Sequence, residues 1–423
     1  MRSKVAIAPP TLQPPPDRTP DPHDSAFPPV PVRVLTIART WIAVAGVFLL
    51  IDMWRHMLVG LTDGNGRPIG DDFINYWSGG ALALAGRAAE AYRYAPYHAF
   101  QETIVGAAVS PMYLYSYPPV MMVLMMPLAL TPYVPAFGIW LVGTWAMFWR
   151  ALRLAMPNGG ALLLALAAPA VFVNAISGQN GAFTAALLGG GLCLLDRRPA
   201  IAGVLFGLLV YKPHLGILLP IALIAGRQWR ALFAAGATVA VLAAASAALF
   251  GPSIFADYLR VAGVLRFVIL ETGEGIWSRM VSVFVFGRLL GLDVAASYAV
   301  QAGSALIAAA VVAFAWFTGR TAPVRYAALV LGTLMATPYL QDYDLVVAVF
   351  AVVWLWQMDG IEQRLRLAAC AALLLLPALA GAIAQATGFS LGPLFILPAF
   401  VIVARSVWRE HSASGAAAAS LPS

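Results

Sequence analysis

Long apolar runs separated by short polar breaks repeat along almost the whole chain, and this pattern limits the possible folds more than any other feature. Hydrophobic residues make up 61% of the chain and charged residues 11%, whereas soluble domains carry roughly 25% charged residues. Inside a bilayer a segment must satisfy its own backbone hydrogen bonds, as helices of roughly 20 apolar residues do. The sequence therefore predicts an all-α polytopic membrane protein.

The charge and the chemistry-bearing residues narrow the function classes. The net charge of +7 comes from basic residues at the ends of apolar segments. This placement indicates that they orient the spans in the membrane and contact anionic lipids, and it does not favour nucleic-acid binding. Cys193 and Cys370 lie inside apolar runs, and none of the five histidines is at metal-ligand spacing with another. No nucleotide-binding or hydrolase motif is present. We expect no metal site and no cofactor.

Composition divides the chain into three parts. Residues 1–32 are rich in proline and predict a disordered cytoplasmic tail that is not cleaved. Residues 33–410 form the transmembrane domain, with a first outer loop at 60–115 and a second large outer loop at 251–292. Residues 411–423, rich in Ala and Ser, predict a second disordered tail.

Basic residues set the expected topology. Arg33 and Arg39 place the N-terminus in the cytoplasm. If the later basic breaks are also cytoplasmic, the breaks at 177–180, 211–214, 251–292 and 337–344 face the same outer side as the first outer loop. Residues 117–153 fit a proline-broken re-entrant element plus one span, which gives about 12 crossings.

The first outer loop contains a segment with helical periodicity. Its apolar positions are Phe73, Trp77, Ala81, Leu84 and Ala88, and the polar residues Asn75, Ser78, Arg87 and Glu90 lie elsewhere around the helix. This pattern predicts an amphipathic helix lying in the membrane interface.

Two adjacent carboxylates, Asp71 and Asp72, precede that helix. Aspartate is a favoured N-cap, so one interpretation is purely structural. The functional alternative is that one carboxylate caps the helix while the other acts as a general base on a sugar hydroxyl. On that interpretation the helix N-terminus keeps the base ionised.

Candidate phosphate ligands lie in two of the outer breaks. Lys212 follows an apolar run and precedes Pro213 and His214. An intramembrane lysine is costly and indicates function, although a snorkelling lysine is the alternative. In the second outer loop, Arg266 or Arg279 could share an anion with Lys212, because an Arg fork matches phosphate oxygens.

Polar residues in the remaining breaks are candidate substrate ligands. Gln179 and Asn180 could orient sugar hydroxyls, and a plain polar turn is the alternative. A Thr-Pro break is followed by Tyr339, Gln341, Asp342 and Asp344, and a loop with an N-cap is the alternative there.

Five short motifs occur in a fixed order along the chain. They are Asp-Phe-x-x-Tyr-Trp at 72–77, Tyr-Pro-Pro at 117–119, Gly-Gln-Asn at 178–180, Lys-Pro at 212–213 and Thr-Pro-x-x-x-x-Tyr-Asp at 337–344. Over roughly residues 34–408, this order and the hydropathy resemble glycosyltransferase family 87. The resemblance implies a GT-C fold, a polyprenyl-phosphate sugar donor, and a lipid or glycan acceptor.

The resemblance also implies roles for single residues. The catalytic base of the family falls on Asp72, and the lysine that contacts the lipid phosphate falls on Lys212. Members often carry His where this chain has Tyr339. The expected donor-phosphate ligands are then Lys212, His214 and Arg279, and the expected substrate-lining residues are Asp71, Tyr76, Gln179, Asn180, Tyr339 and Asp342.

The expected function is therefore inverting transfer of a hexose at the extracytoplasmic side of the inner membrane, and the resemblance implies that the hexose is mannose. A transporter or lipid flippase is the alternative, although no paired inverted halves are visible in the sequence. A structural subunit for polymer assembly is a third possibility, and it would leave Asp72 dispensable.

Overall fold

The computed structural model describes residues 31–157, 159–273 and 276–419, so most of the predicted N-terminal tail lies outside the described residues. These residues form helices and contain isolated β-bridges but no longer strand. The helices are α1 Val32–Arg55, α2 Phe73–Leu84, α3 Tyr94–Val105, α4 Pro119–Ala129, α5 Tyr133–Ala155, α6 Ala161–Ala167, α7 Pro169–Ile176, α8 Gly181–Leu194, α9 Pro199–Leu208, α10 Leu219–Ala225, α11 Trp229–Phe250, α12 Ile254–Leu265, α13 Val283–Leu289, α14 Val294–Phe317, α15 Ala322–Ala336, α16 Ala348–Gln357, α17 Gln363–Thr387 and α18 Gly392–Ala419.

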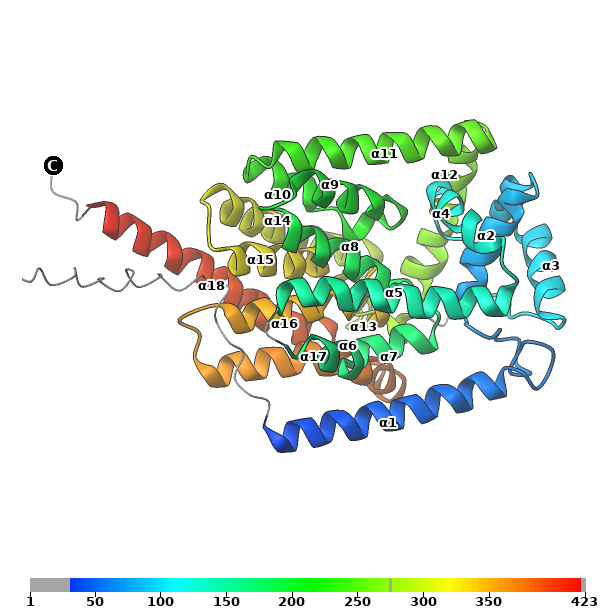
Figure 1. The fold of residues 1–423 in the computed structure, drawn as a ribbon, viewed down its shortest axis with the longest axis horizontal. Helices are drawn as coiled ribbons and strands as arrows, with labels where there is room; N and C mark the ends of the chain where they lie inside the picture. The colour runs from blue at the N-terminus through cyan, green and yellow to red at the C-terminus, as the bar shows by residue number, and fades with distance from the viewer. Residues whose placement is uncertain (1–30, 158, 274–275, 420–423) are drawn as a thin grey trace, which may run out of the picture.

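The long helices run along the long axis of the molecule (Figure 1). Helices α1 and α11 lie along opposite sides, while α2, α3, α4 and α12 gather at one end, and α18 extends from the other end. Helices α8, α15 and α16 are buried along almost their whole length and form the core. Helix α1 is peripheral and packs on α6 and α7, where Trp41 and Phe48 contact Phe172 edge to face.

Several apolar helices identify a membrane protein. Within the described ranges, five helices are long and apolar enough to cross a bilayer, or six if the bent pair α4 and α5 is counted as one span. The bend between α4 and α5 is 111°, which fits either a broken span or a re-entrant loop, so the re-entrant element stays a prediction. Other apolar helices are shorter than the roughly 20 residues that a span needs. The predicted number of about 12 crossings is therefore not confirmed and stays a prediction.

Helix α2 differs from the predicted amphipathic helix. It ends at Leu84, and the polar residues Asn75 and Ser78 are buried together with its apolar residues. Tyr97 and Gln101 of α3 hydrogen-bond to Asn75, which supplies the polar partners that solvent was expected to supply. The expectation of an exposed polar face is wrong for these two residues, and the interfacial location is not confirmed.

The C-terminal helix α18 continues to Ala419, into the segment predicted to be a disordered tail. Alanine has the highest helix propensity of the amino acids, so an Ala-rich segment can extend a helix that is already formed. Composition alone underestimated the ordering effect of the preceding helix.

Candidate active site

Asp72 lies in a tight turn immediately before α2. Gly70 and Asp71 both have positive φ angles, 78° and 44°, and this conformation turns the chain into the helix. The Asp72 side chain makes no capping hydrogen bond to the helix backbone. Instead Oδ1 accepts a hydrogen bond from Asn75 Nδ2 at 3.2 Å, and Oδ2 accepts one from Gln179 Nε2. The capping interpretation of Asp72 is therefore wrong.

The neighbouring Asp71 is held away from the helix terminus as well. Its Oδ1 accepts a hydrogen bond from the Tyr113 hydroxyl at 2.5 Å, and its Oδ2 lies 3.3 Å from an Arg67 guanidinium nitrogen. Arg67 also donates to the carbonyl of Ile176. This ion pair links the turn at Asp71 to the end of α7 and leaves Asp72 as the carboxylate that faces the other breaks.

Two glycines bring the break between α7 and α8 against its neighbours. A Cβ atom on Gly178, whose φ is 54°, would collide with the carbonyl oxygen of Gly70, and one on Gly181 would collide with the carbonyl oxygen of Tyr343. The Asp72 amide donates to Ser177 O at 3.3 Å. Only glycine permits these close approaches, and they place Gln179 and Asn180 between the turn at Asp72 and the break before α16.

Lys212 is buried and paired. Its Nζ lies 2.5 Å from Asp344 Oδ1 and donates to Asn180 Oδ1 at 2.9 Å. The side chains of Lys212 and Asp344 are 5% and 0% exposed, so a snorkelling lysine does not describe this site. A buried lysine requires a counter-ion, and Asp344 supplies it, a pairing that the sequence did not predict.

Arg279 forms a second ion pair beside the first. Its Nε and Nη2 donate to the two oxygens of Asp342 at 3.1 and 3.0 Å, and Nη2 also donates to Ser177 Oγ at 2.8 Å. Lys212 Nζ and the Arg279 guanidinium lie 4.7 and 5.5 Å from the centre of the same Tyr343 ring. Both cations therefore lie close to one aromatic side chain.

The two candidate arginines of the second outer loop, Arg266 and Arg279, lie in different surroundings. The Arg279 side chain is 29% exposed, and an antiparallel bridge between Met280 and Gln341 holds its segment against the break before α16. Arg266 pairs with Glu271 at 3.2 Å and is 61% exposed. Arg279 is the one that joins the network around Asp72.

His214 and Tyr339 lie at the edge of this cluster, with ring centroids 6.0 Å apart. His214 Nε2 is buried and has no hydrogen-bond partner within the described part of the chain. The structure brings both residues together but shows no contact from either to Asp72. Their predicted roles stay predictions.

Burial controls the protonation of Asp72. Removal from water, together with the charge of Asp71, raises the pKa of the Asp72 carboxyl to about 7. The Arg279 charge, the hydrogen bond from Gln179 and the Lys212 charge act in the opposite direction. A helix N-terminus was expected to keep this group ionised, but desolvation outweighs that effect. A pKa near neutrality suits a general base.

An apolar groove lies next to the polar cluster, at the bend between α4 and α5. Its volume is about 440 Å³, and it is lined by Met121, Leu124, Met125, Pro127, Leu128, Thr131, Ile139, Trp140 and Phe183. Trp140 packs on Tyr76 with ring centroids 5.6 Å apart, and Phe183 packs on Tyr211 at 5.4 Å. The groove therefore reaches the aromatic residues that surround the polar cluster.

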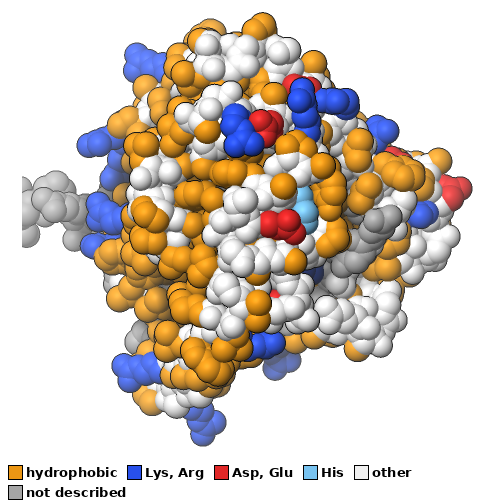
Figure 2. All heavy atoms as spheres, turned by 90° about the vertical axis from the view of Figure 1, so that its right-hand side faces the viewer, with side chains coloured by type: hydrophobic (Ala, Val, Ile, Leu, Met, Phe, Trp, Pro, Cys, Tyr) orange, Lys and Arg blue, Asp and Glu red, His pale blue; other side chains and the backbone are white. Residues whose placement is uncertain are grey.

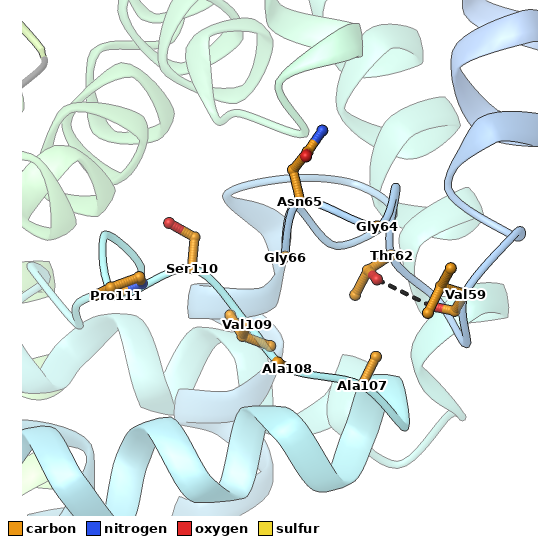
Figure 3. Close-up of a pocket in the computed structure, with 10 residues that line it drawn as sticks. All are labelled: Val59, Thr62, Gly64, Asn65, Gly66, Ala107, Ala108, Val109, Ser110 and Pro111. Carbon is orange, nitrogen blue, oxygen red and sulfur yellow. Dashed lines mark hydrogen bonds between the residues drawn. The ribbon is translucent and has the colours of Figure 1, made fainter.

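A second cavity lies elsewhere in the first outer loop. Figure 3 shows its lining from residues 59–66 and 107–111, with the Thr62 hydroxyl donating to Val59 O. Its volume is about 400 Å³ and no charged side chain lines it. Figure 2 shows the end of the molecule that carries α2 and α3, where charged side chains of both signs lie among hydrophobic ones. Among the described residues, no group of three or more His, Cys, Asp or Glu could hold a metal ion.

The model of glycosyltransferase family 87 matches residues 115–338, more than half of the chain. The match includes Gln179, Lys212 and Arg279, while Asp72 precedes it. No curated protein matches, and neither does any solved structure. The match contains three of the five motifs in full, those at 117–119, 178–180 and 212–213. It confirms the resemblance, and the chain belongs to glycosyltransferase family 87.

Proposed function

We propose that this membrane glycosyltransferase has the GT-C fold and moves a hexose from a polyprenyl-phosphate donor to a lipid or glycan acceptor by inverting displacement. In this proposal the sugar is mannose, and the active site faces the extracytoplasmic side of the cell membrane. The observation that supports this best is that one carboxylate, Asp72, and two cations, Lys212 and Arg279, meet through contacts with the breaks at 177–180 and 342–344.

The chemistry of the donor fits this arrangement. A phosphate monoester has a second pKa of about 6, so the polyprenyl phosphate leaves as an anion and needs cations more than it needs a strong acid. Arg279 is partly exposed and can meet the phosphate at the edge of the site, while Lys212 lies deeper. Arg279 presents a planar fork of donors for phosphate oxygens. His214 lies beside them as a third candidate ligand.

The acceptor hydroxyl needs a base on the opposite face of the sugar. Asp72 has a pKa of about 7, so a substantial fraction is ionised near neutral pH and can accept the hydroxyl proton as the new bond forms. In this proposal Asp71, Tyr76, Gln179, Asn180, Tyr339 and Asp342 line the sugar and acceptor positions.

The groove at the bend between α4 and α5 suits the isoprenoid chain of the donor. Its lining is almost entirely apolar, with the Thr131 hydroxyl as an exception. Burial of an apolar chain there is favourable. Two of the lining residues, Trp140 and Phe183, pack on Tyr76 and Tyr211 beside the polar cluster.

A transfer assay tests the proposed function. Purified protein in lipid vesicles is incubated with radiolabelled polyprenyl-phosphate mannose or glucose and with membrane lipids from the cell. Label that moves from the donor to a new acceptor supports the proposal. Unchanged labelled donor that crosses the vesicle membrane would indicate a flippase, and label that neither moves nor reacts would indicate a structural subunit.

A further inference from the structure

A continuous hydrogen-bond chain joins Asp72 to Lys212 through the protein interior. From Lys212 Nζ the chain passes to Asn180 Oδ1 at 2.9 Å. Asn180 Nδ2 then donates to the hydroxyls of Tyr117 at 3.0 Å and Tyr76 at 3.2 Å, and Tyr117 donates to Tyr76 at 3.2 Å.

The last two links complete the chain at the carboxylate. The Tyr76 hydroxyl donates to Gln179 Oε1, and Gln179 Nε2 donates to Asp72 Oδ2. Tyr76 and Asn180 are fully buried, and Gln179 is 3% exposed. Buried polar groups of this kind are normally satisfied by hydrogen-bond partners. Here the partner of each of these side chains is another member of the hydrogen-bond chain.

The two ends of the chain set its direction. An ammonium can only donate hydrogen bonds and an ionised carboxylate can only accept them. Each intermediate group therefore accepts on the side of Lys212 and donates on the side of Asp72. If Asp72 were the donor, the Gln179 amide would have to turn over and present its Nε2 to a Tyr76 hydroxyl that already accepts from Asn180 and Tyr117. The chain therefore favours the ionised form of Asp72.

We propose that Gln179 is a positioning residue for Asp72: held by Tyr76 on one side, it fixes the carboxylate as an acceptor ready to take the proton of the incoming hydroxyl. This inference rests on the proposed function, and it gives Gln179 a role in the protein interior in addition to any contact with the sugar. The second oxygen of Asp72 is held by Asn75 Nδ2 at 3.2 Å. Two amides thus orient one carboxylate, and of the two, Gln179 connects it to Lys212.

Other charges act on Asp72 and must be held constant in any test. Asp71 lies on the same turn and Arg279 on the second outer loop, and both influence the Asp72 carboxyl, as does Lys212. Asp71 is itself paired with Arg67, Arg279 with Asp342, and Lys212 with Asp344. Substitution of Gln179 or Tyr76 changes none of these charges, so a shift in the titration of Asp72 would report the hydrogen bond.

The test compares Gln179→Met, Tyr76→Phe and the double variant with Tyr326→Phe. Tyr326 is also a buried tyrosine, and its hydroxyl donates to Asp196 Oδ2 at 3.0 Å, outside the network around Asp72. Gln179→Met and Tyr76→Phe should each lower kcat by about tenfold or more and leave the KM for the donor unchanged. The double variant should lose little more than Gln179→Met, because groups that act as a unit are not additive. Tyr326→Phe should behave like the wild type.

The titration of Asp72 provides a readout that does not need turnover. Infrared difference spectra of the wild type minus Asp72→Asn identify the carboxyl band, and its midpoint should rise in Gln179→Met because a donor to the ionised form is lost. An unchanged midpoint would overturn the inference, as would a raised donor KM with unchanged kcat, which would indicate direct sugar contact. If the wild type shows no transfer, the proposed function fails, while the infrared midpoint still decides whether Gln179 holds the carboxylate.

Discussion

Removal of the Lys212 charge should unfold the centre of the site unless its partner is changed as well. Lys212→Met leaves the Asp344 carboxylate, which is 0% exposed, without its counter-ion. Breaking a buried ion pair by loss of one partner costs about 3–5 kcal/mol, whereas replacing both partners is often neutral. We therefore expect Lys212→Met to lose about 3–5 kcal/mol of unfolding free energy and Lys212→Met/Asp344→Asn to recover most of it.

The assay is unfolding in mixed detergent micelles, followed by the transfer assay on each variant that stays folded. The Asn side chain at position 344 keeps an oxygen that can accept the hydrogen bond from the backbone N–H of Gln341, which donates to Asp344 Oδ2 at 3.2 Å. If Lys212 also holds the donor phosphate, the double variant regains stability but its donor KM stays high. A Lys212→Met protein as stable as the wild type would refute the reasoning on burial. A double variant with normal KM would refute the phosphate role.

Three further predictions follow from the same site. Asp72 has a pKa of about 7, and only its ionised form accepts a proton. The transfer rate should therefore rise with pH through about 7 and level off above it. A rate that is flat between about pH 6 and 8 would contradict this. Gly178→Ala should abolish transfer because the added Cβ meets the carbonyl oxygen of Gly70. Gly86 has a similar φ of 71° and open space around it, so Gly86→Ala should lower the unfolding free energy only by the backbone strain of about 1–2 kcal/mol. Unfolding and transfer assays on both variants check this. Arg279→Gln should raise the donor KM about tenfold or more, while Arg266→Gln, from an exposed pair on the same outer loop, should leave it unchanged; equal donor KM values for the two would contradict the assignment.

Much of the helix layout could be predicted because hydropathy is a local property. The apolar runs before Gly251 and Thr318 became α11 and α14. The breaks that carry Gln179 and Lys212 were predicted to face the side of Asp72, and the structure brings them together there. This followed from alternation of the crossings and from positive charges at helix ends.

Partner choice could not be predicted in the same way, because it depends on contacts between distant residues. Asp344 lies 132 positions from Lys212, and no local pattern joins them. The burial of α2 was missed for a related reason: Asn75 is polar in sequence, but its partners Tyr97 and Gln101 come from another helix. A lysine between two apolar runs was the one signal that could have prompted a search for a buried acid.

The central claim is that Asp72 removes the proton from the acceptor hydroxyl, and the transfer rate of Asp72→Asn tests it most directly. The control is Asp63→Asn, which changes another aspartate of the first outer loop whose carboxylate accepts backbone amides. We predict that Asp72→Asn lowers the transfer rate by about 10²–10⁴-fold, with normal membrane insertion and donor binding, and that Asp63→Asn stays close to the wild type. A wild-type transfer rate in Asp72→Asn would contradict the account.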